Sequence, residues 1–261
     1  MCVQHTPAHT SEHQRSPRCK PIAGFTALHL GRLHPNRHPQ HGGHLMPTLT
    51  LVRHGQANTS ARNEADYDRL SPLGHQQAQW LGAHIAGTGE VFSRVYCGTL
   101  QRHRETAAGM GHANPQVDAR LNEMEFFSLA QLWQAQQGVP VPVNREEFVD
   151  YMPRLLAAWQ ADAIDNPPET FAQFEARVGA ALADIAAGHG PALLVTSGGL
   201  IAMALRHVMA LDLPSFARAT LAIMNTSVHR LHPIGGGLAL TQFNAIPHLE
   251  HPERQFAQTH L

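Results

Sequence analysis

The alternation of short apolar segments with helical segments constrains the fold of this chain more than any other feature. Apolar segments at residues 49–52, 91–97 and 191–196 have the length and composition of buried β-strands. Apolar residues at helical spacing lie between them, most clearly over residues 169–187. Strands that alternate with helices favour a mostly parallel sheet covered on both faces. The sequence therefore predicts a three-layer α/β/α sandwich with a mostly parallel central sheet.

Polar turns follow these predicted strands. They are Arg53-His54-Gly55, the segment after Cys97, and Ser197-Gly198-Gly199. Ligands in open α/β folds bind at the carboxyl ends of the strands. We therefore predict that the three turns form the functional site, whatever the chemistry of that site is.

The first 45 residues differ in composition from the rest of the chain. They hold eight of the 20 histidines, five prolines, five basic residues and one acidic residue, without helical or strand periodicity. Irregular histidine spacing disfavours a metal-binding tract, and the absence of a clear small-residue cleavage site disfavours a signal peptide. We expect residues 1–45 to be disordered or to precede a true start at Met46. Residues 46–261 are predicted to form one domain, with a helical insertion at about 124–168.

Charge and cysteine content exclude several classes of partner. The chain has 19 basic and 20 acidic residues, whereas a nucleic-acid-binding surface needs a basic excess. Three cysteines fit neither a disulfide framework nor a zinc site, which favours a reducing compartment, and we expect a cytoplasmic protein. No apolar run reaches the ~18 residues of a transmembrane helix, so no membrane association is expected. Assembly into a homo-oligomer stays open.

Four motifs occur in order between residues 49 and 226. They are Leu51-Val52-Arg53-His54-Gly55-Gln56, the segment 66–78 with Leu70-Ser71-Pro72-Leu73-Gly74, the segment Tyr96–Ala107 with Leu100-Gln101-Arg102 and Thr106-Ala107, and Leu121-Asn122-Glu123. Alone, an Arg-His-Gly triplet indicates no more than a strand end with a surface histidine. Together, the four motifs resemble those of the histidine phosphatase superfamily, the phosphoglycerate mutase-like proteins. The resemblance implies the phosphoglycerate mutase-like fold.

The resemblance also implies a two-step phosphoryl transfer. His54 would attack phosphorus, since a neutral imidazole is a competent nucleophile near pH 7, and would form a phosphohistidine. Arg53 and Arg102 would hold the phosphate oxygens with their planar, charged guanidinium groups. Glu123 would protonate the leaving oxygen and later activate water, with Glu125 as a backup acid if the segment is extended. No metal or other cofactor is required, because the arginines supply the positive charge.

Other side chains near these motifs are expected to have structural roles. Cys97 is predicted to be a small core residue. Arg104 lies two residues after Arg102 and should face elsewhere on a helix. His75, His84 and His103 also lie on predicted helices and are interpreted as surface or packing residues.

Ser197 departs from the pattern of the superfamily. The superfamily normally ends this strand with His-Gly, and the second histidine donates to the phosphate. A serine hydroxyl can donate one hydrogen bond to a phosphoryl oxygen, so Ser197 is predicted to bind phosphate, but without charge. The loss could lower the rate by roughly two to three orders of magnitude. The free N–H groups of the following helix offset part of it.

The retained residues favour a phosphomonoester hydrolase of the histidine acid phosphatase type, whose partner is a small phosphorylated substrate. An inactive or weak phosphate-binding scaffold on the same fold is the alternative. Mutase activity is less favoured, because the predicted insertion has only Arg145 and Arg154 against six acidic residues and would repel a doubly phosphorylated intermediate. The substrate could have an apolar or cationic body. Phe126, Phe127 and Trp133 either line its binding site or belong to the core.

Overall fold

The computed structural model describes residues 47–260 of the 261 residues. The predictions for residues 1–45 and for a start at Met46 therefore lie outside the described part of the chain.

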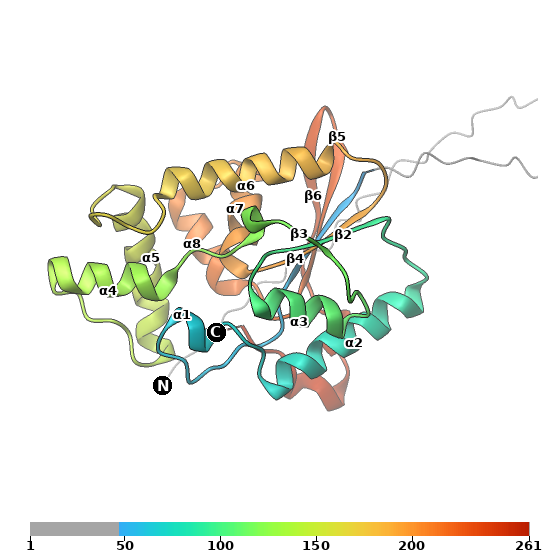
Figure 1. The fold of residues 1–261 in the computed structure, drawn as a ribbon, viewed down its shortest axis with the longest axis horizontal. Helices are drawn as coiled ribbons and strands as arrows, with labels where there is room; N and C mark the ends of the chain where they lie inside the picture. Colours follow the sequence, from blue (N-terminus) through green and yellow to red (C-terminus); the bar gives the residue numbers. More distant parts are fainter. Residues whose placement is uncertain (1–46, 261) are drawn as a thin grey trace, which may run out of the picture. The chain divides into compact units, whose positions relative to one another are not determined.

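Seventeen helical and strand elements follow one another in the described part (Figure 1). The strands are β1 (Leu49–Arg53), β2 (Arg94–Cys97), β3 (Gln116–Val117), β4 (Ala192–Thr196), β5 (Val228–Ile234) and β6 (Gly237–Ala245). The α-helices are α1 (Glu64–Tyr67), α2 (Pro72–Thr88), α3 (Gln101–Gly109), α4 (Phe126–Gln137), α5 (Arg145–Gln160), α6 (Phe171–Ala186), α7 (Gly198–Met209) and α8 (Leu213–Ala222). Short 3-10 helices are η1 (Ala119–Leu121), η2 (Pro247–Leu249) and η3 (Pro252–Ala257).

The six strands form one sheet in the order β3-β2-β4-β1-β5-β6. The pairs β2–β3, β2–β4 and β1–β4 are parallel, and β5 and β6 extend the sheet as an antiparallel hairpin. The prediction of a mostly parallel sheet is confirmed. Strand β5 was not predicted, because histidines and an arginine interrupt the apolar alternation of this strand. The two-residue turn Gly235-Gly236 has positive φ at both positions, as a tight hairpin requires.

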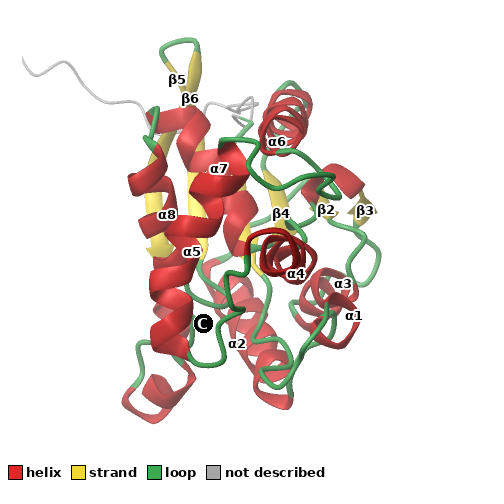
Figure 2. Ribbon diagram, turned by 90° about the vertical axis from the view of Figure 1, so that its left-hand side faces the viewer, coloured by secondary structure: helices red, strands yellow, loops and turns green. Residues whose placement is uncertain are grey.

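Alternating side chains of the strands build two separate cores, one on each face of the sheet. Leu49 and Leu51 pack with Leu194 and with helices α4 to α8 in the larger core. Val52 and Val195 pack with α2 and α3 in the smaller core. Helices therefore cover both faces, which confirms the predicted α/β/α sandwich (Figure 2).

Two helix starts follow from local sequence. Ser71 caps α2, since its side chain accepts a hydrogen bond from the backbone N–H of Gly74, and Pro72 takes the first helical position as predicted. Thr170 and Gln173 form a reciprocal capping box at the start of α6. Between η1 and α6 the chain forms α4 and α5, in the segment that the sequence analysis treated as an insertion.

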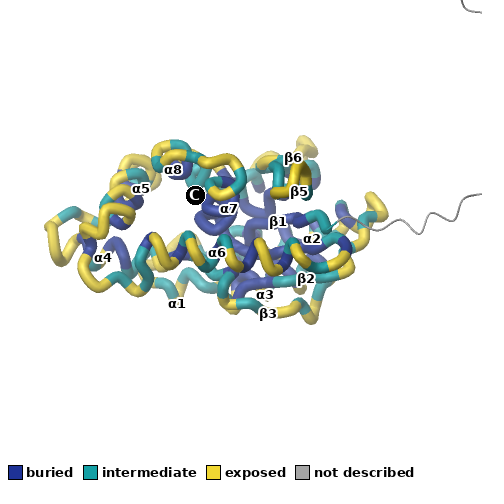
Figure 3. The backbone as a smooth tube through the Cα atoms, turned by 90° about the horizontal axis from the view of Figure 1, so that it is seen from above, coloured by how far each residue is buried: buried dark blue, intermediate teal, exposed yellow. Residues whose placement is uncertain are grey.

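Helix α7 lies deeper in the fold than the other helices. Its residues from Gly198 to Leu205 are all buried, whereas α6 keeps one face exposed (Figure 3). The segment that carries Ser197 and Gly198 is therefore surrounded by protein on both sides. Among residues 47–260, no helix is long and apolar enough to cross a membrane.

Two histidines outside the predicted motifs are buried near the β5 end of the sheet. His229 and His248 have their pKa lowered from 6.5 to about 3, chiefly because burial disfavours the charged imidazolium. The unfolded chain binds protons on these histidines as the pH falls through 6.5, whereas the folded chain does not. Their contribution to stability is therefore complete above pH 6.5 and is lost as the pH falls toward 3.

We expect this linkage to be measurable with His229→Gln. Between about pH 7.5 and about pH 5, His229 alone should remove about 2 kcal/mol from the free energy of unfolding of the wild type. The glutamine variant lacks the titrating group, so the stability gap between the two proteins should narrow by about that amount. Urea denaturation at both pH values measures the gap, and a gap that does not change would contradict the expectation.

Candidate active site

Strand pairing brings the three predicted turns to one edge of the sheet. Arg53 pairs with Thr196 at the ends of β1 and β4, and Cys97 pairs with Val195 one strand further. The backbone N–H of His54 donates to the carbonyl oxygen of Thr196 at 2.8 Å. Arg53 and His54 therefore lie beside the start of α7, although more than 140 residues separate these two segments in the sequence.

His54 is held in one tautomer. Its side chain is 2% exposed, and Nδ1 lies 2.7 Å from the backbone oxygen of Gly55. A carbonyl oxygen can only accept, so Nδ1 carries the proton and Nε2 keeps its lone pair. No group of residues 47–260 forms a hydrogen bond with Nε2. The available atom of the ring is therefore nucleophilic.

Burial keeps this imidazole neutral. The pKa of His54 lies well below 6.5, first because of desolvation and then because of the positive charges of Arg102 and Arg53. A neutral ring surrounded by guanidinium groups can attack an anionic group that those same guanidiniums attract. This electrostatic arrangement fits the nucleophilic role predicted for His54.

Two glycines allow the turn after His54 to lie close to helix α2. A Cβ on Gly55 would collide with the backbone of Gly74, and a Cβ on Gly74 would collide with the backbone of Gln56. The backbone N–H of Gly55 also donates to the hydroxyl of Thr106 on α3 at 3.0 Å. The position of His54 is therefore fixed by contacts of the motif residues Gly55, Gly74 and Thr106.

Arg102 is buried and oriented by Asp68. Its Nη1 lies 3.2 Å from Oδ1 of Asp68, and its side chain is 3% exposed. The same carboxylate accepts hydrogen bonds from the backbone N–H groups of Gln101 and Arg102, at the start of α3. Asp68 therefore caps the helix and positions the guanidinium in one arrangement.

Arg53 is held by carbonyl oxygens. Its Nη1 donates to the backbone oxygens of Ile223 and His260, the latter at 2.6 Å, whereas its buried Nε has no partner among residues 47–260. The chain near residue 260 thus reaches the phosphate-binding arginine predicted from the first motif. No signal in the sequence indicated this contact.

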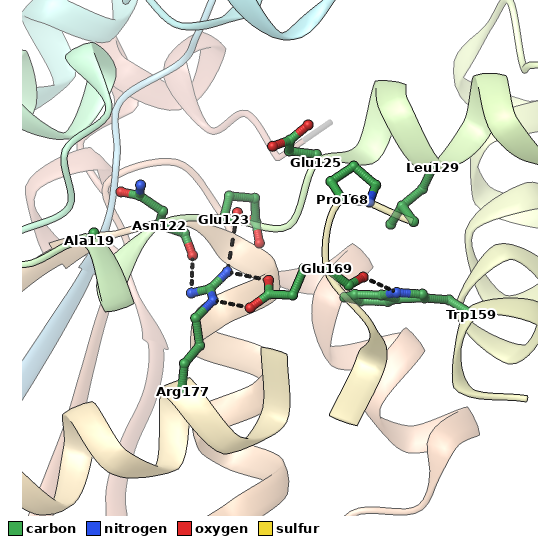
Figure 4. A pocket seen from close by; sticks show the side chains of 9 residues that line it. All are labelled: Ala119, Asn122, Glu123, Glu125, Leu129, Trp159, Pro168, Glu169 and Arg177. Carbon is green, nitrogen blue, oxygen red and sulfur yellow. Dashed lines mark hydrogen bonds and ion pairs between the residues drawn. The ribbon is translucent and has the colours of Figure 1, made fainter. Parts of the chain in front are cut away.

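Glu123, two residues after η1, lies against the first turn of α7. Its Oε2 accepts a hydrogen bond from the backbone N–H of Gly199 at 2.8 Å, and a Cβ on Gly199 would collide with this carboxylate. Arg177 holds the segment that carries Glu123. It donates to the backbone oxygens of Asn122 and Glu123 and forms an ion pair with Glu169 (Figure 4). A glycine at position 199 is thus required for this approach.

Four of the five predicted site residues line one cavity of about 580 Å³. Arg53, His54, Arg102 and Glu123 line it, as do Gly198 and Gly199. Its other ionisable side chains are Arg62, Glu64, Tyr67 and Arg145. Its apolar wall consists of Met124, Phe126, Phe127, Val141, Phe148 and Met152, from α4, α5 and the segments beside them. The polar side chains of Gln131, Gln134, Asn144 and Arg145 line the cavity from the same region. The volume is typical of a small-molecule site.

Ser197 is the fifth predicted residue, and the structure places it next to this cavity rather than in its lining. It is fully buried, and its Oγ lies 2.6 Å from Nε2 of His103. His103, interpreted from the sequence as a surface or packing residue, is also fully buried, with its ring centroid 5.8 Å from that of His54. The signal that could have identified His103 is its position directly after Arg102.

Glu64 lines the cavity and was not predicted from the sequence. Burial raises its pKa, and its Oε1 accepts a hydrogen bond from the backbone N–H of Phe127 at 2.8 Å. No motif contains this residue. Only the folding of α1 against α4 brings it into the cavity.

Several secondary expectations need correction. Glu125 is exposed and does not line the cavity, because the chain turns into α4 there instead of continuing as an extended strand. For the three aromatic residues both alternatives had been open, and Trp133 belongs to the core, whereas Phe126 and Phe127 line the cavity. None of the six acidic residues counted in the predicted insertion lines the cavity, whereas Arg145 does. The charge argument against a polyanionic substrate therefore fails.

Two other expectations are confirmed. Cys97 is a fully buried free cysteine in the smaller core. Arg104 is exposed, on the opposite side of α3 from the buried Arg102.

The pair Arg102 and Arg104 allows a matched test of oxyanion binding. Arg102→Ala should weaken the binding of inorganic phosphate by about 10- to 100-fold, because it removes charge-assisted hydrogen bonds inside a buried site. Arg104→Ala on the same helix should change the dissociation constant by less than about twofold, since an exposed charge is screened. Isothermal titration calorimetry measures both constants. Equal losses in the two variants would contradict the assignment.

Comparisons with known proteins agree with the fold and the motifs. The model of the histidine phosphatase superfamily (branch 1) matches residues 49–246. Serine/threonine-protein phosphatase PGAM5, mitochondrial, of Xenopus laevis is 30% identical over 139 residues, which are 49% of this chain and 45% of that protein. The chain thus matches less than half the length of this curated relative.

Solved structures share the fold. Phosphoserine phosphatase from Entamoeba histolytica, in complex with 3-phosphoglyceric acid, superimposes with a TM-score of 0.57 at 20% identity and covers 77% of this chain and 98% of its own. Phosphoglycerate mutase from Bacillus anthracis gives a TM-score of 0.57 at 20% identity, with 78% and 95% coverage. At these identities the likeness concerns the fold. Because the family model matches most of the chain and the four motifs meet at one cavity, this protein belongs to the histidine phosphatase superfamily (branch 1).

Proposed function

We propose that this protein hydrolyses phosphomonoesters through a phosphohistidine on His54. The observation that carries the proposal is the neutral imidazole with Nε2 unbonded, in a cavity that it shares with Arg53, Arg102 and Glu123. Membership of the histidine phosphatase superfamily supports the same reaction class. The phosphatase named among the relatives is consistent with it.

In the first step, Nε2 of His54 attacks the phosphorus atom of the monoester. A bond forms between nitrogen and phosphorus while the bond from phosphorus to the ester oxygen breaks. Arg53 and Arg102 offset the negative charge on the phosphoryl oxygens in the transition state. The Nδ1–H bond to the oxygen of Gly55 stabilises the positive charge that develops on the ring.

Glu123 serves as the general acid and base. In its protonated form it gives a proton to the leaving alcohol, and as a carboxylate it then accepts a proton from the attacking water. Water displaces His54 from phosphorus and releases inorganic phosphate. Glu123 must exchange its hydrogen bond with Gly199 for one with the substrate during the first step.

The apolar wall of the cavity supports a substrate with an apolar body. Phe126, Phe127 and Phe148 belong to α4 and α5 and pack against one another, whereas Arg53 and Arg102, at the proposed phosphate end of the cavity, belong to β1 and α3. Burial of an aryl or alkyl group against these rings would add binding energy without any polar contact. We therefore propose hydrophobic phosphomonoesters as the preferred substrates.

Two other functions remain as competing proposals. A phosphate-binding scaffold would retain the arginines but would not turn over. A mutase would need a second anionic group to be held beyond the first, and the positions of Arg62 and Arg145 in the cavity favour this possibility more than the sequence did. Among the cavity-lining residues of α4 and α5, Arg145 is the one basic side chain, and this small number favours hydrolysis.

Hydrolysis of p-nitrophenyl phosphate tests the reaction. His54→Ala should reduce kcat by at least about 1,000-fold, because the proposed covalent intermediate forms on the imidazole of His54. Glu123→Gln should reduce kcat by about 100-fold or more through loss of acid–base catalysis. Glu125→Gln is the matched control two residues away and should stay within about twofold of the wild type. Equal rates for His54→Ala and the wild type would support the scaffold instead.

Substrate preference tests the apolar wall. Phe148→Ala should lower kcat/KM for naphthyl phosphate by about 10-fold, because roughly 1–2 kcal/mol of apolar burial is lost. The same variant should leave kcat/KM for a small polar ester such as glycerol phosphate within about twofold. Val149→Ala, on the same helix but outside the cavity lining, provides the control. Parallel losses on both substrates would argue against a hydrophobic substrate site.

A further inference from the structure

His103 and Ser197 form a buried pair beside the nucleophile. Nε2 of His103 lies 2.6 Å from Oγ of Ser197, and both residues are fully buried. The imidazole of His103 is tilted by 31° against that of His54, with a centroid distance of 5.8 Å. A second imidazole therefore lies next to His54, although it comes from α3 and not from the end of β4.

Glycine at position 98 makes room for this imidazole. A Cβ on Gly98 would collide with the His103 ring and with the side-chain oxygen of Asn122. Ser197 is also small, so both neighbours leave space that the ring of His103 fills. The arrangement depends on three positions, which are Gly98 after β2, His103 in α3 and Ser197 after β4.

Hydrogen bonding indicates which nitrogen of His103 carries the proton. Burial and the charge of Arg102 hold the pKa of His103 well below 6.5, so the ring is neutral and has one N–H. Its Nδ1 is buried without a partner among residues 47–260. Placing the proton on Nδ1 would leave a buried donor unsatisfied, whereas Nε2–H can donate to the hydroxyl oxygen of Ser197.

This bond leaves the hydroxyl proton of Ser197 available. Oγ of Ser197 accepts from His103 and donates to no group in the described part of the chain. Ser197 is the N-cap residue of α7, and the next residues, Gly198 and Gly199, line the cavity. A Cβ on Gly198, the residue after Ser197, would lie 3.5 Å from Nε of Arg53, so Ser197 adjoins the residue that lies against this arginine.

We propose that His103 is a positioning residue that orients the hydroxyl of Ser197 as a hydrogen-bond donor to a phosphoryl oxygen. The two side chains would together replace the single histidine that the resemblance implied at position 197. The pair is neutral, so it adds a directed hydrogen bond while Arg53 and Arg102 supply the charge. The inference rests on the proposed function for its ligand, an oxyanion of phosphorus.

A double-mutant cycle on His103 and Ser197 tests the proposal. The primary measurement is the dissociation constant for inorganic phosphate, which needs no turnover, and the second is kcat/KM for p-nitrophenyl phosphate. His103→Ala and Ser197→Ala should each raise the dissociation constant and lower kcat/KM by about 10-fold, because one directed hydrogen bond to an anion is lost. The double variant should be no weaker than either single variant, since both act through one hydroxyl.

A conservative variant separates positioning from packing. His103→Gln keeps an N–H near the place of Nε2 and should retain phosphate affinity within about threefold of the wild type. His103→Leu keeps most of the volume but no donor and should behave like His103→Ala. Additive losses in the cycle, or equal affinity for His103→Gln and His103→Leu, would overturn the proposal and leave a packing role.

An exchange of the two side chains provides an independent measurement. His103→Ala combined with Ser197→His should recover most of the activity lost in His103→Ala, because the vacated space accepts an imidazole from β4. Ser197→His alone should be impaired, since His103 already fills that space. An exchange variant that is folded but no more active than His103→Ala would count against the proposal.

The outcomes distinguish this inference from the proposed hydrolysis. Phosphate binding that depends on the His103–Ser197 pair, without hydrolysis dependent on His54, would retain the pair and reject the enzyme. Hydrolysis that depends on His54 but not on His103 or Ser197 would retain the enzyme and reject the pair. A wild-type protein that does not bind phosphate at all would overturn the inference.

Discussion

The parallel pairing of β1 with β4 is the contact on which the site depends. It sets Arg53 opposite Thr196, and the hydrogen bond from the His54 N–H to the Thr196 oxygen continues the ladder by one residue. A shift of one residue would turn the alternate side chains of β1 toward the opposite face of the sheet. The buried valines and leucines of the two cores exclude such a shift, so the register that forms the core also positions His54.

Burial of the strand ends that carry the site explains its electrostatics. His54, Arg102 and Ser197 are almost completely buried, and in such surroundings an unpaired charge is costly. Arg102 is therefore paired with Asp68, and Arg53 donates to backbone oxygens. The same burial and the same guanidiniums keep His54 neutral. Burial thus explains both the stabilising contacts of the arginines and the neutral state of the imidazole.

The sequence predicted the framework of this site well and its surroundings poorly. Arg53, His54, Arg102 and Glu123 lie in local motifs with strand or helix signals, and all four line one cavity. Strand β5 was missed, because its polar residues face partners that no local pattern reveals. Local charge counts also failed for α4 and α5, since a count cannot say which face of a helix meets the cavity.

By itself, the sequence determined the layer architecture, the helix caps and the strand ends that carry polar residues, because periodicity and capping are local properties of the chain. Only the tertiary structure decided the environment of each group. Glu64 enters the cavity, Glu125 leaves it, and His103 lies against Ser197 because helices α1, α3 and α4 pack as they do. Hydrogen-bond partners and pKa values depend on neighbours distant in sequence, and only close packing of the folded chain brings those neighbours together.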